Sequence, residues 1–238
     1  MDWFRAVDIY CERTSPAFWA EPVNALTNAA FLLAALWGAV EARRREITSP
    51  VVWLLIALAA LIGVGSFLFH SYATVWAGLA DVVPIWTFVA VFVVVALHRI
   101  GGLSAGGITL LVIALVLAAT LLVMLGSNGP PPEAPRPPSR LNGSEQYAPA
   151  IAALLGFSLL MAWRRHPLRH WVWAATAVFA LSLTFRTLDP AVCDRFPLGT
   201  HFLWHLLNGL TIGLLLQMLV RTGHGDIHAP PRSTPPAR

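Results

Sequence analysis

The chain has 238 residues, of which 57% are hydrophobic and only 12% are charged. About a quarter of the residues of a soluble domain are charged, so this composition excludes an ordinary soluble globule and indicates a membrane protein. The 16 basic residues are all Arg, and with 12 acidic residues they give a formal net charge of +4. They stand in short clusters, which indicate membrane topology, and we expect no nucleic-acid partner.

Seven apolar stretches are long enough to cross a bilayer as helices, which takes about 17 to 25 residues each. The predicted fold is therefore an all-α integral membrane protein, a bundle of seven transmembrane helices. No cleavable signal peptide is predicted, and the first span is expected to direct insertion. The spans are predicted approximately at residues 22–40, 51–69, 80–97, 107–125, 147–163, 170–188 and 199–220.

The distribution of Arg predicts the orientation, because cytoplasmic loops accumulate positive charge. Ten fall on one side of the membrane, namely Arg43, Arg44, Arg45, Arg99, Arg164, Arg165, Arg169, Arg221, Arg232 and Arg238, and six on the other, namely Arg5, Arg13, Arg136, Arg140, Arg186 and Arg195. We therefore predict an outer N-terminus and a cytoplasmic C-terminus. The Arg-only, Ala-rich composition is typical of a GC-rich bacterium, so we expect the protein in a bacterial inner (cell) membrane.

The domain organisation follows from these spans. Residues 1–21 are predicted to form an N-terminal segment on the outer face, residues 22–220 a single seven-helix transmembrane domain, and residues 221–238 a disordered cytoplasmic tail. Within the domain, residues 126–146 are rich in Pro, Gly and Ser and are predicted to form a flexible loop.

Two histidines open the last span in the pattern His201-Phe-Leu-Trp-His205. A helix places residues four apart on one face, about 6 Å from each other, which suits two ligands of one zinc ion. The Glu of the HExxH metalloprotease pattern is missing, so a general base must come from another segment. Taken alone, the pair is explained equally well by hydrogen bonding in the helix bundle.

Three further polar residues reach the same depth of the membrane. Ser66 and His70 lie four apart at the outer end of the second span, and Asp81 opens the third. Three neutral imidazoles with an open fourth position form a catalytic zinc arrangement, which lowers the pKa of a water ligand to about 7. Asp81 would take a proton from that water and pass it to the leaving group, and the Ser66 hydroxyl would donate a hydrogen bond to the oxyanion that develops in the reaction. Singly, Asp81 also fits a helix cap and Ser66 a packing position, but together they favour a site.

The two cysteines, Cys11 and Cys193, both fall on the predicted outer face. They form either a disulfide or two unpaired thiols, and their shared face favours the disulfide in an oxidising compartment.

Oxygen-bearing side chains gather at the N-terminal end of the first span. Asp8, Glu12, Glu21, Asn24 and Asn28 offer the ligands that a hard cation such as calcium requires. Solvated interfacial charge explains them equally well.

Two other polar positions lie near the predicted site. Arg186 and Asp189 are three residues apart and are expected to form a local ion pair. Asn208 shares a helix face with the two histidines of the last span, where it either orients a ligand or packs against a neighbouring helix.

Together these segments resemble the alkaline ceramidases, seven-span zinc amidases of the superfamily that also includes adiponectin-receptor-like proteins. The matching pieces follow one another in the same order and cover about a quarter of the chain. They are Tyr10-Cys11-Glu12, EPVNALTN at residues 21–28, GVGSFLFH at residues 63–70 with Asp81, and Cys193 followed by HFLWH at residues 201–205.

The resemblance implies zinc on His70, His201 and His205, catalysis by Ser66 and Asp81, and a Cys11–Cys193 disulfide. It also implies hydrolysis of the amide of a ceramide-like N-acyl lipid to a free fatty acid and a long-chain amine base. Some family members bind calcium through N-terminal acids, which here would be Glu12 and Glu21. Ile9 and Thr14 stand where the family has an Asp and an Asn, and Asp8 is displaced by one residue.

Other seven-span proteins fit less well. Retinal attachment needs a Lys amine, and the chain contains no Lys. A transporter would show repeats and broken helices at mid-membrane, which the sequence lacks. The alternative that remains is a non-catalytic receptor or structural zinc protein of the same superfamily. The partners expected are the membrane and a lipid substrate, and no protein partner is indicated.

Overall fold

The computed structural model describes residues 2–126 and 141–222, with backbone alone at residues 118, 119 and 122–126. The described chain is all-α, apart from a single bridge between Ala6 and Thr74. Its helices are α1 Pro22–Thr27, α2 Ala29–Arg44, α3 Pro50–Tyr72, α4 Val75–Arg99, α5 Ala105–Gly126, the 3-10 helix η1 Ser144–Tyr147, α6 Ala148–Trp163, α7 Arg169–Val192 and α8 His201–Arg221.

Six helical stretches in the described residues are long and apolar enough to cross a membrane, and they identify a multi-pass integral membrane protein. They are Pro22–Arg44, Pro50–Tyr72, Val75–Arg99, Ser144–Trp163, Arg169–Val192 and His201–Arg221, which correspond to six of the seven predicted spans. The remaining predicted span, 107–125, falls in α5. Only its part Ala105–Leu117 counts there as a shorter apolar helix, so a seventh crossing stays a prediction.

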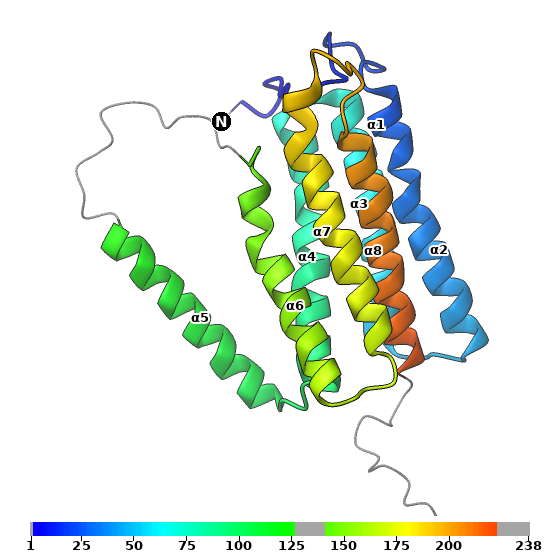
Figure 1. Ribbon diagram of the computed structural model, residues 1–238, viewed down its shortest axis with the longest axis vertical. Coiled ribbons are helices and arrows are strands. Elements are labelled where there is room, and N and C mark those ends of the chain that lie inside the picture. Colours follow the sequence, from blue (N-terminus) through cyan, green and yellow to red (C-terminus); the bar gives the residue numbers. More distant parts are fainter. Residues whose placement is uncertain (1, 127–140, 223–238) are drawn as a thin grey trace, which may run out of the picture.

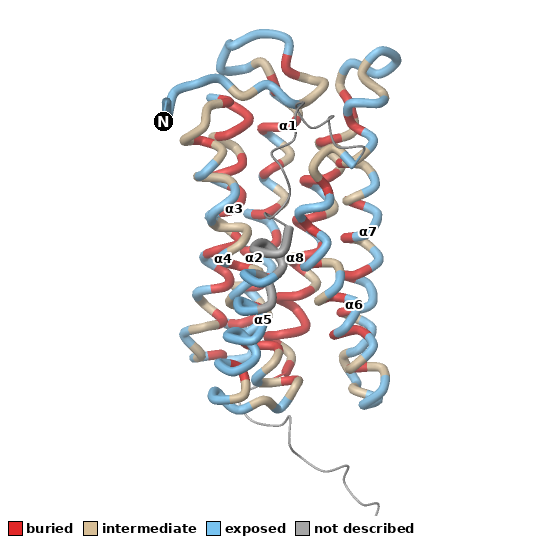
Figure 2. The backbone as a smooth tube through the Cα atoms, turned by 90° about the vertical axis from the view of Figure 1, so that its left-hand side faces the viewer, coloured by how far each residue is buried: buried red, intermediate tan, exposed pale blue. Residues whose placement is uncertain are grey.

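Helix α8 is the most buried of these six stretches and packs against α1, α2, α3 and α7. Helix α3 packs along α4, whereas α5 makes few contacts with the bundle and stands apart from it in Figure 1. The tube in Figure 2 shows buried segments facing the middle of the bundle and exposed ones facing outward. Helix α8 therefore carries its first-turn residues into the interior, where lipid does not reach them.

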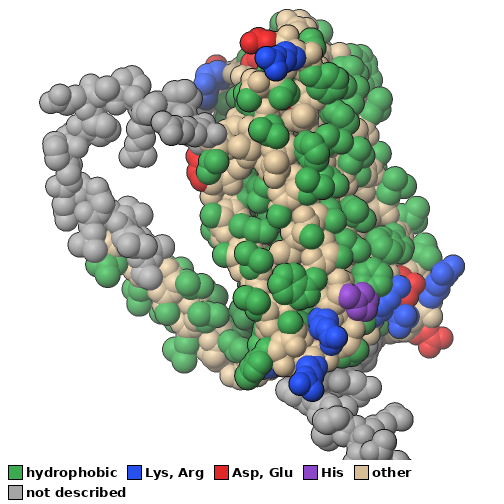
Figure 3. Space-filling view, viewed as in Figure 1, with side chains coloured by type: hydrophobic (Ala, Val, Ile, Leu, Met, Phe, Trp, Pro, Cys, Tyr) green, Lys and Arg blue, Asp and Glu red, His purple; other side chains and the backbone are tan. Residues whose placement is uncertain are grey.

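The outer surface of the bundle is apolar along most of its length and charged at its ends. Figure 3 shows hydrophobic side chains over the helices, with Arg gathered at the end where α2, α6 and α8 finish. The segment before α1 covers the opposite end, next to the α3–α4 and α7–α8 connections (Figures 1 and 2). This distribution suits a protein whose middle is surrounded by lipid.

The structure describes only part of the predicted flexible loop. Residues 127–140 lie outside the described residues, as does the predicted tail from residue 223 onward. Gly126 ends α5, residues 141–143 are ordered as a turn, and residues 144–146 belong to η1. Arg186 explains this order, because its guanidinium donates to the Asn142 carbonyl and the Ser144 hydroxyl, and Asn142 donates in turn to the Arg186 carbonyl.

Candidate metal centre

Three histidines meet at the end of the bundle that the N-terminal segment covers. His70 comes from the last turn of α3, and His201 and His205 come from the first two turns of α8. Each is 1% exposed, and one ring nitrogen from each lies within 4.8 Å of the others. The structure thus brings together the three predicted ligands, in an arrangement that can hold a metal ion.

Hydrogen bonds orient two of these rings. His70 Nδ1 lies 2.6 Å from a Glu21 carboxylate oxygen, and His205 Nδ1 lies 3.0 Å from the Thr27 hydroxyl. The Thr27 hydrogen is used on the Val23 carbonyl, so the hydroxyl oxygen accepts from His205. Both Nδ1 atoms are therefore assigned as protonated, which leaves both Nε2 lone pairs free to bind a metal.

His201 tests whether a metal fits the cluster. Both of its ring nitrogens are buried, and neither has a hydrogen-bond partner among the described residues, which is costly unless a ligand binds there. Its ring stacks on Tyr10, with centroids 3.7 Å apart. Burial raises the pKa of Tyr10 well above its usual value, so the phenol stays neutral beside the cluster. Three buried imidazoles, one of them with unpartnered nitrogens, fit a zinc ion.

Glu21 stands just before the first span and supports the cluster from the N-terminal side. It is 3% exposed and accepts hydrogen bonds from His70, Arg13 and Asn24. Burial alone would raise the pKa of this carboxyl, but the bonds from His70, Arg13 and Asn24 hold it below its usual value. Glu21 is therefore a carboxylate that receives the His70 proton, a pairing typical of histidines that bind zinc.

Ser66 and Asp81 lie where α3 and α4 come closest. A Cβ on Gly65 would collide with the backbone carbonyl of Ala80, so only glycine permits this approach. Ser66 is 4% exposed, and the Asp81 side chain lies close to those of Ser66 and His70. Within the described part of the chain, one buried oxygen of Asp81 has no hydrogen-bond partner. Both predicted residues thus lie beside the histidine cluster.

The prediction of a local ion pair between Arg186 and Asp189 is wrong for the described structure. The Asp189 carboxylate instead accepts from the backbone N–H groups of Thr200 (2.7 Å), His201 (2.9 Å) and Cys11 (3.2 Å). Two of these groups open α8, where the helix dipole and unpaired donors favour an anion. Asp189 therefore fixes the start of the helix that carries both histidines.

Arg186 turns the other way and contacts two aromatic rings. Its guanidinium carbon lies 5.4 Å from the centroid of Tyr147 and 5.7 Å from that of Trp204. Both rings line the cavity described below. Sequence spacing alone favoured the neighbour three residues away, but the helix end attracts Asp189 more strongly.

The disulfide expected between Cys11 and Cys193 is present. It joins the N-terminal segment to the end of α7, eight residues before His201. Together with the Asp189–Cys11 bond, it holds that segment over the cluster, including Tyr10.

The acids predicted to bind calcium have other partners. Each Glu12 oxygen lies 2.7 Å from a backbone N–H at the start of α1, those of Val23 and Asn24, so this residue caps a helix. Glu21 is engaged by His70, Arg13 and Asn24, as described above. Among the described residues, neither acid belongs to a group of three or more ligand side chains. The residues present therefore do not fit the calcium site expected at Glu12 and Glu21.

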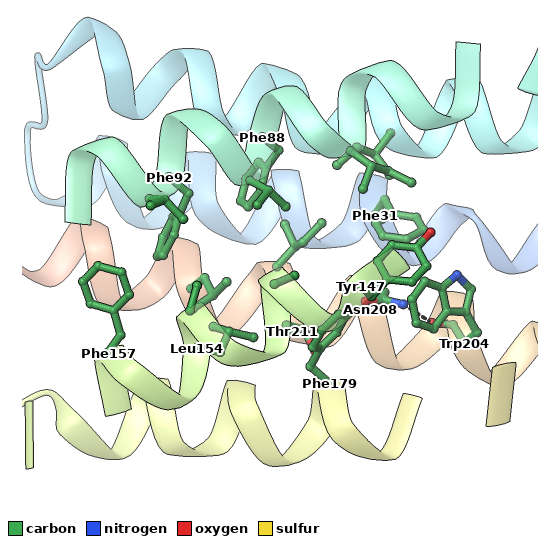
Figure 4. A pocket seen from close by; sticks show the side chains of 18 residues that line it. Phe31, Phe88, Phe92, Tyr147, Leu154, Phe157, Phe179, Trp204, Asn208 and Thr211 are labelled. Atoms are coloured by element: carbon green, nitrogen blue, oxygen red, sulfur yellow. Dashed lines mark hydrogen bonds between the residues drawn. The ribbon is translucent and has the colours of Figure 1, made fainter. Parts of the chain in front are cut away.

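An apolar cavity of about 90 Å³ opens between α4 and α6, below the cluster. Figure 4 shows Phe88 and Phe92 facing Leu154 and Phe157 across it, with Tyr147, Trp204 and Asn208 at one end. Three lining residues stand one helical turn from site residues: Ile62 from Ser66, Ile85 from Asp81, and Asn208 from His205. The cavity therefore begins about one helical turn from the site and extends toward the middle of the bundle.

Sequence reasoning missed three residues that hold the cluster: Thr27, Arg13 and Asp189. Thr27 had a signal, since Glu21, Asn24 and Thr27 recur every three residues and thus share a helix face. Arg13 and Asp189 make contacts through chain turns that no local spacing predicts. Asn208, predicted either to orient a ligand or to pack, donates to the Trp204 carbonyl of its own helix.

The fold and the cluster define a multi-pass membrane protein with a buried three-histidine site able to hold a metal. Residues 9–131 match the ceramidase family model, which is more than half of the 238 residues, and the chain belongs to this family. This confirms the resemblance found in the sequence. The matched range contains His70 and Asp81 and ends before α8. No curated protein matches the chain.

Proposed function

We propose that the protein is a zinc-dependent amidase that hydrolyses the amide bond of a ceramide-like N-acylated lipid to a free fatty acid and a long-chain amine base. Family membership supports amide hydrolysis. The observation that carries the proposal is the convergence of His70, His201 and His205 beside Asp81 and Ser66, one helical turn from an apolar cavity.

The three histidine side chains would hold zinc through one ring nitrogen each. Zinc supplies a Lewis acid there and makes water acidic enough to be deprotonated near pH 7. Glu21 and Thr27 would keep two of the rings in the tautomer with a free Nε2. Asp189 holds the backbone of the third, His201.

Asp81 and Ser66 would carry the proton and charge of the reaction. Asp81 takes a proton from the attacking water as the water oxygen bonds to the amide carbon. It returns that proton to the nitrogen as the C–N bond breaks, so the amine leaves neutral and the acyl group becomes the fatty acid. The Ser66 hydroxyl would turn from Asp81 to donate to the oxygen of the tetrahedral intermediate.

The cavity is suited to an acyl or alkyl chain. Its wall is apolar apart from a few groups at the end nearest the site, among them the Tyr147 hydroxyl and the Asn208 amide. A lipid whose tail occupied it would place its head group near Asp81. By the distribution of Arg, this end of the bundle would face outside a bacterial inner membrane.

The test is to purify the protein, measure its bound metals, and detect fatty acid released from ceramides and other N-acyl lipids. We expect about one zinc per chain, with hydrolysis of at least one lipid. His205→Ala should lose both zinc and hydrolysis. His170→Ala, a control at an exposed histidine, should keep both. Zinc without hydrolysis of any lipid would contradict the proposal and favour the receptor or structural zinc protein.

A further inference from the structure

Arg13 is a buried cation with an unusual set of partners. Its side chain is 3% exposed, although it lies in an otherwise mostly exposed N-terminal segment. Its Nε donates to Glu21 at 2.5 Å, its Nη1 to the carbonyls of Ser15 (3.0 Å) and Ala17 (3.4 Å), and its Nη2 to the carbonyl of His70 at 2.8 Å.

These contacts place four oxygen atoms around one guanidinium, a carboxylate and three backbone carbonyls. Carboxylate and carbonyl oxygens are also the ligands that calcium prefers. Of the oxygen ligands predicted for calcium, only Glu21 belongs to this set, and the chain's own cation occupies it. A calcium ion there would displace Arg13 or face its positive charge at short range.

Arg13 is linked to the histidine cluster by two sets of hydrogen bonds. Through Glu21, it contacts the carboxylate that receives the Nδ1 proton of His70. Through the His70 carbonyl, it contacts the backbone of the same ligand in the last turn of α3. That carbonyl is among the last four of the helix, which lack partners within it, and a cation is favourable at this end.

We propose that Arg13 takes the place of a calcium ion in this protein, and that it acts as a positioning residue that holds Glu21 and His70 in the geometry for binding zinc. The identity of the metal as zinc rests on the proposed function. The role of Arg13 and Glu21 in holding His70 for the metal does not depend on the substrate.

The first test uses the zinc-loaded full-length protein without any variant. Thermal unfolding and zinc affinity are measured with millimolar CaCl₂, in calcium-depleted buffer without added calcium or chelator, and with MgCl₂ as a control. We expect the same unfolding temperature and zinc affinity in all three conditions. A saturable rise of the unfolding temperature with calcium alone would overturn the proposal.

The second test removes the guanidinium. Arg13→Ala should weaken zinc binding about 10- to 100-fold, the usual effect of losing a residue that orients a ligand. Millimolar guanidinium, or calcium entering the vacated oxygens, should restore part of the affinity, whereas NaCl of equal ionic strength should not. Arg5→Ala, at an exposed position of the same segment, is the matched control and should bind zinc normally. Unchanged zinc affinity in Arg13→Ala would contradict the positioning role.

Zinc affinity is measured by competition with a chelator and needs no substrate. If no lipid is hydrolysed, the proposed function fails while the role of Arg13 is still tested. If hydrolysis occurs and Arg13→Ala binds zinc as tightly as the wild type, the inference about Arg13 fails alone. If Arg13→Ala does not fold, the calcium titration of the wild type still decides whether calcium binds at the four oxygen atoms around Arg13.

Discussion

The metal-centre end of the bundle and the cavity between α4 and α6 are built in opposite ways. At the metal centre, the buried side chains are mostly polar, and hydrogen bonds, an ion pair and a disulfide connect the N-terminal segment, α1, α3 and α8. In the cavity, apolar side chains of α4 and α6 face each other with few polar groups. The first region is held together by directional contacts and the second only by shape.

This difference suggests a division of work. Directional contacts fix ring nitrogens and carboxylates, which a metal and a proton transfer require within fractions of an ångström. An alkyl chain has no polar atoms to orient, so a space bounded by apolar side chains suffices. Changes at the metal centre should therefore abolish function, whereas changes in the cavity should adjust which lipid is accepted.

Asp81→Asn should have the largest effect among four further changes, because it removes the proton carrier and keeps the shape. We expect bound zinc to be retained and turnover to fall about 10²- to 10⁴-fold. Asp194→Asn, at an exposed aspartate of the same end, serves as the control. Wild-type turnover in Asp81→Asn would rule out the acid–base role.

Loss of the disulfide should come next. Cys11→Ser should lower the free energy of unfolding by about 2–4 kcal/mol, because the bridge joins residues 182 positions apart. Cys193→Ser and the double variant should lose the same amount, since each removes the same bond. Thermal unfolding with and without a reductant measures this. A reductant that leaves wild-type unfolding unchanged would show that the bond contributes nothing.

Gly65→Ala should have a smaller effect that links packing to chemistry. The new Cβ meets the backbone of Ala80, which cannot turn aside, so α3 and α4 must separate. We expect a loss of about 1–3 kcal/mol of stability, with a fall in turnover as Asp81 moves from Ser66. In the control Gly156→Ala, a Cβ meets none of the described residues within 4 Å, and the change should be neutral or slightly stabilising. Equal behaviour of the two variants would exclude the close approach as a determinant.

The cavity should respond most mildly. Ala153→Phe fills part of the space between α4 and α6, and should raise KM about tenfold for long-chain amides while leaving zinc content and short-chain turnover unchanged. Its neighbour Ala152 is exposed and does not line the cavity, so Ala152→Phe should behave as the wild type. The comparison is made by measuring KM against chain length. A loss that is independent of chain length would place the lipid tail elsewhere.

The features that sequence predicted here are those with a local signature. Apolar length located the helices, since a span must satisfy its backbone within itself. The spacing of His201 and His205, and the helix ends at His70 and Asp81, predicted one site because antiparallel spans return to the same depth. The placement of both cysteines on one face of the membrane followed from the same alternating direction of the spans.

The features that sequence did not predict depend on contacts between distant turns of the chain. Asp189 was assigned to its neighbour Arg186, because helical spacing says nothing about the start of α8 that folds back beside it. Glu12 and Glu21 were candidate calcium ligands because oxygen-bearing side chains gather before the first span and the resembled family binds calcium through N-terminal acids, with solvated charge as the alternative. The path of the chain between residues 10 and 24 decides whether these carboxylates accept hydrogen bonds from a helix start, an imidazole or an arginine.

The central claim is that three imidazoles bind one zinc ion, and X-ray absorption at the zinc edge of the purified protein tests it most directly. The account predicts three nitrogen neighbours at about 2.0–2.1 Å that carry the signature of imidazole, with a light-atom neighbour in the fourth position. Zinc with fewer than three imidazole neighbours, or a metal-replete preparation that holds no zinc, would contradict it.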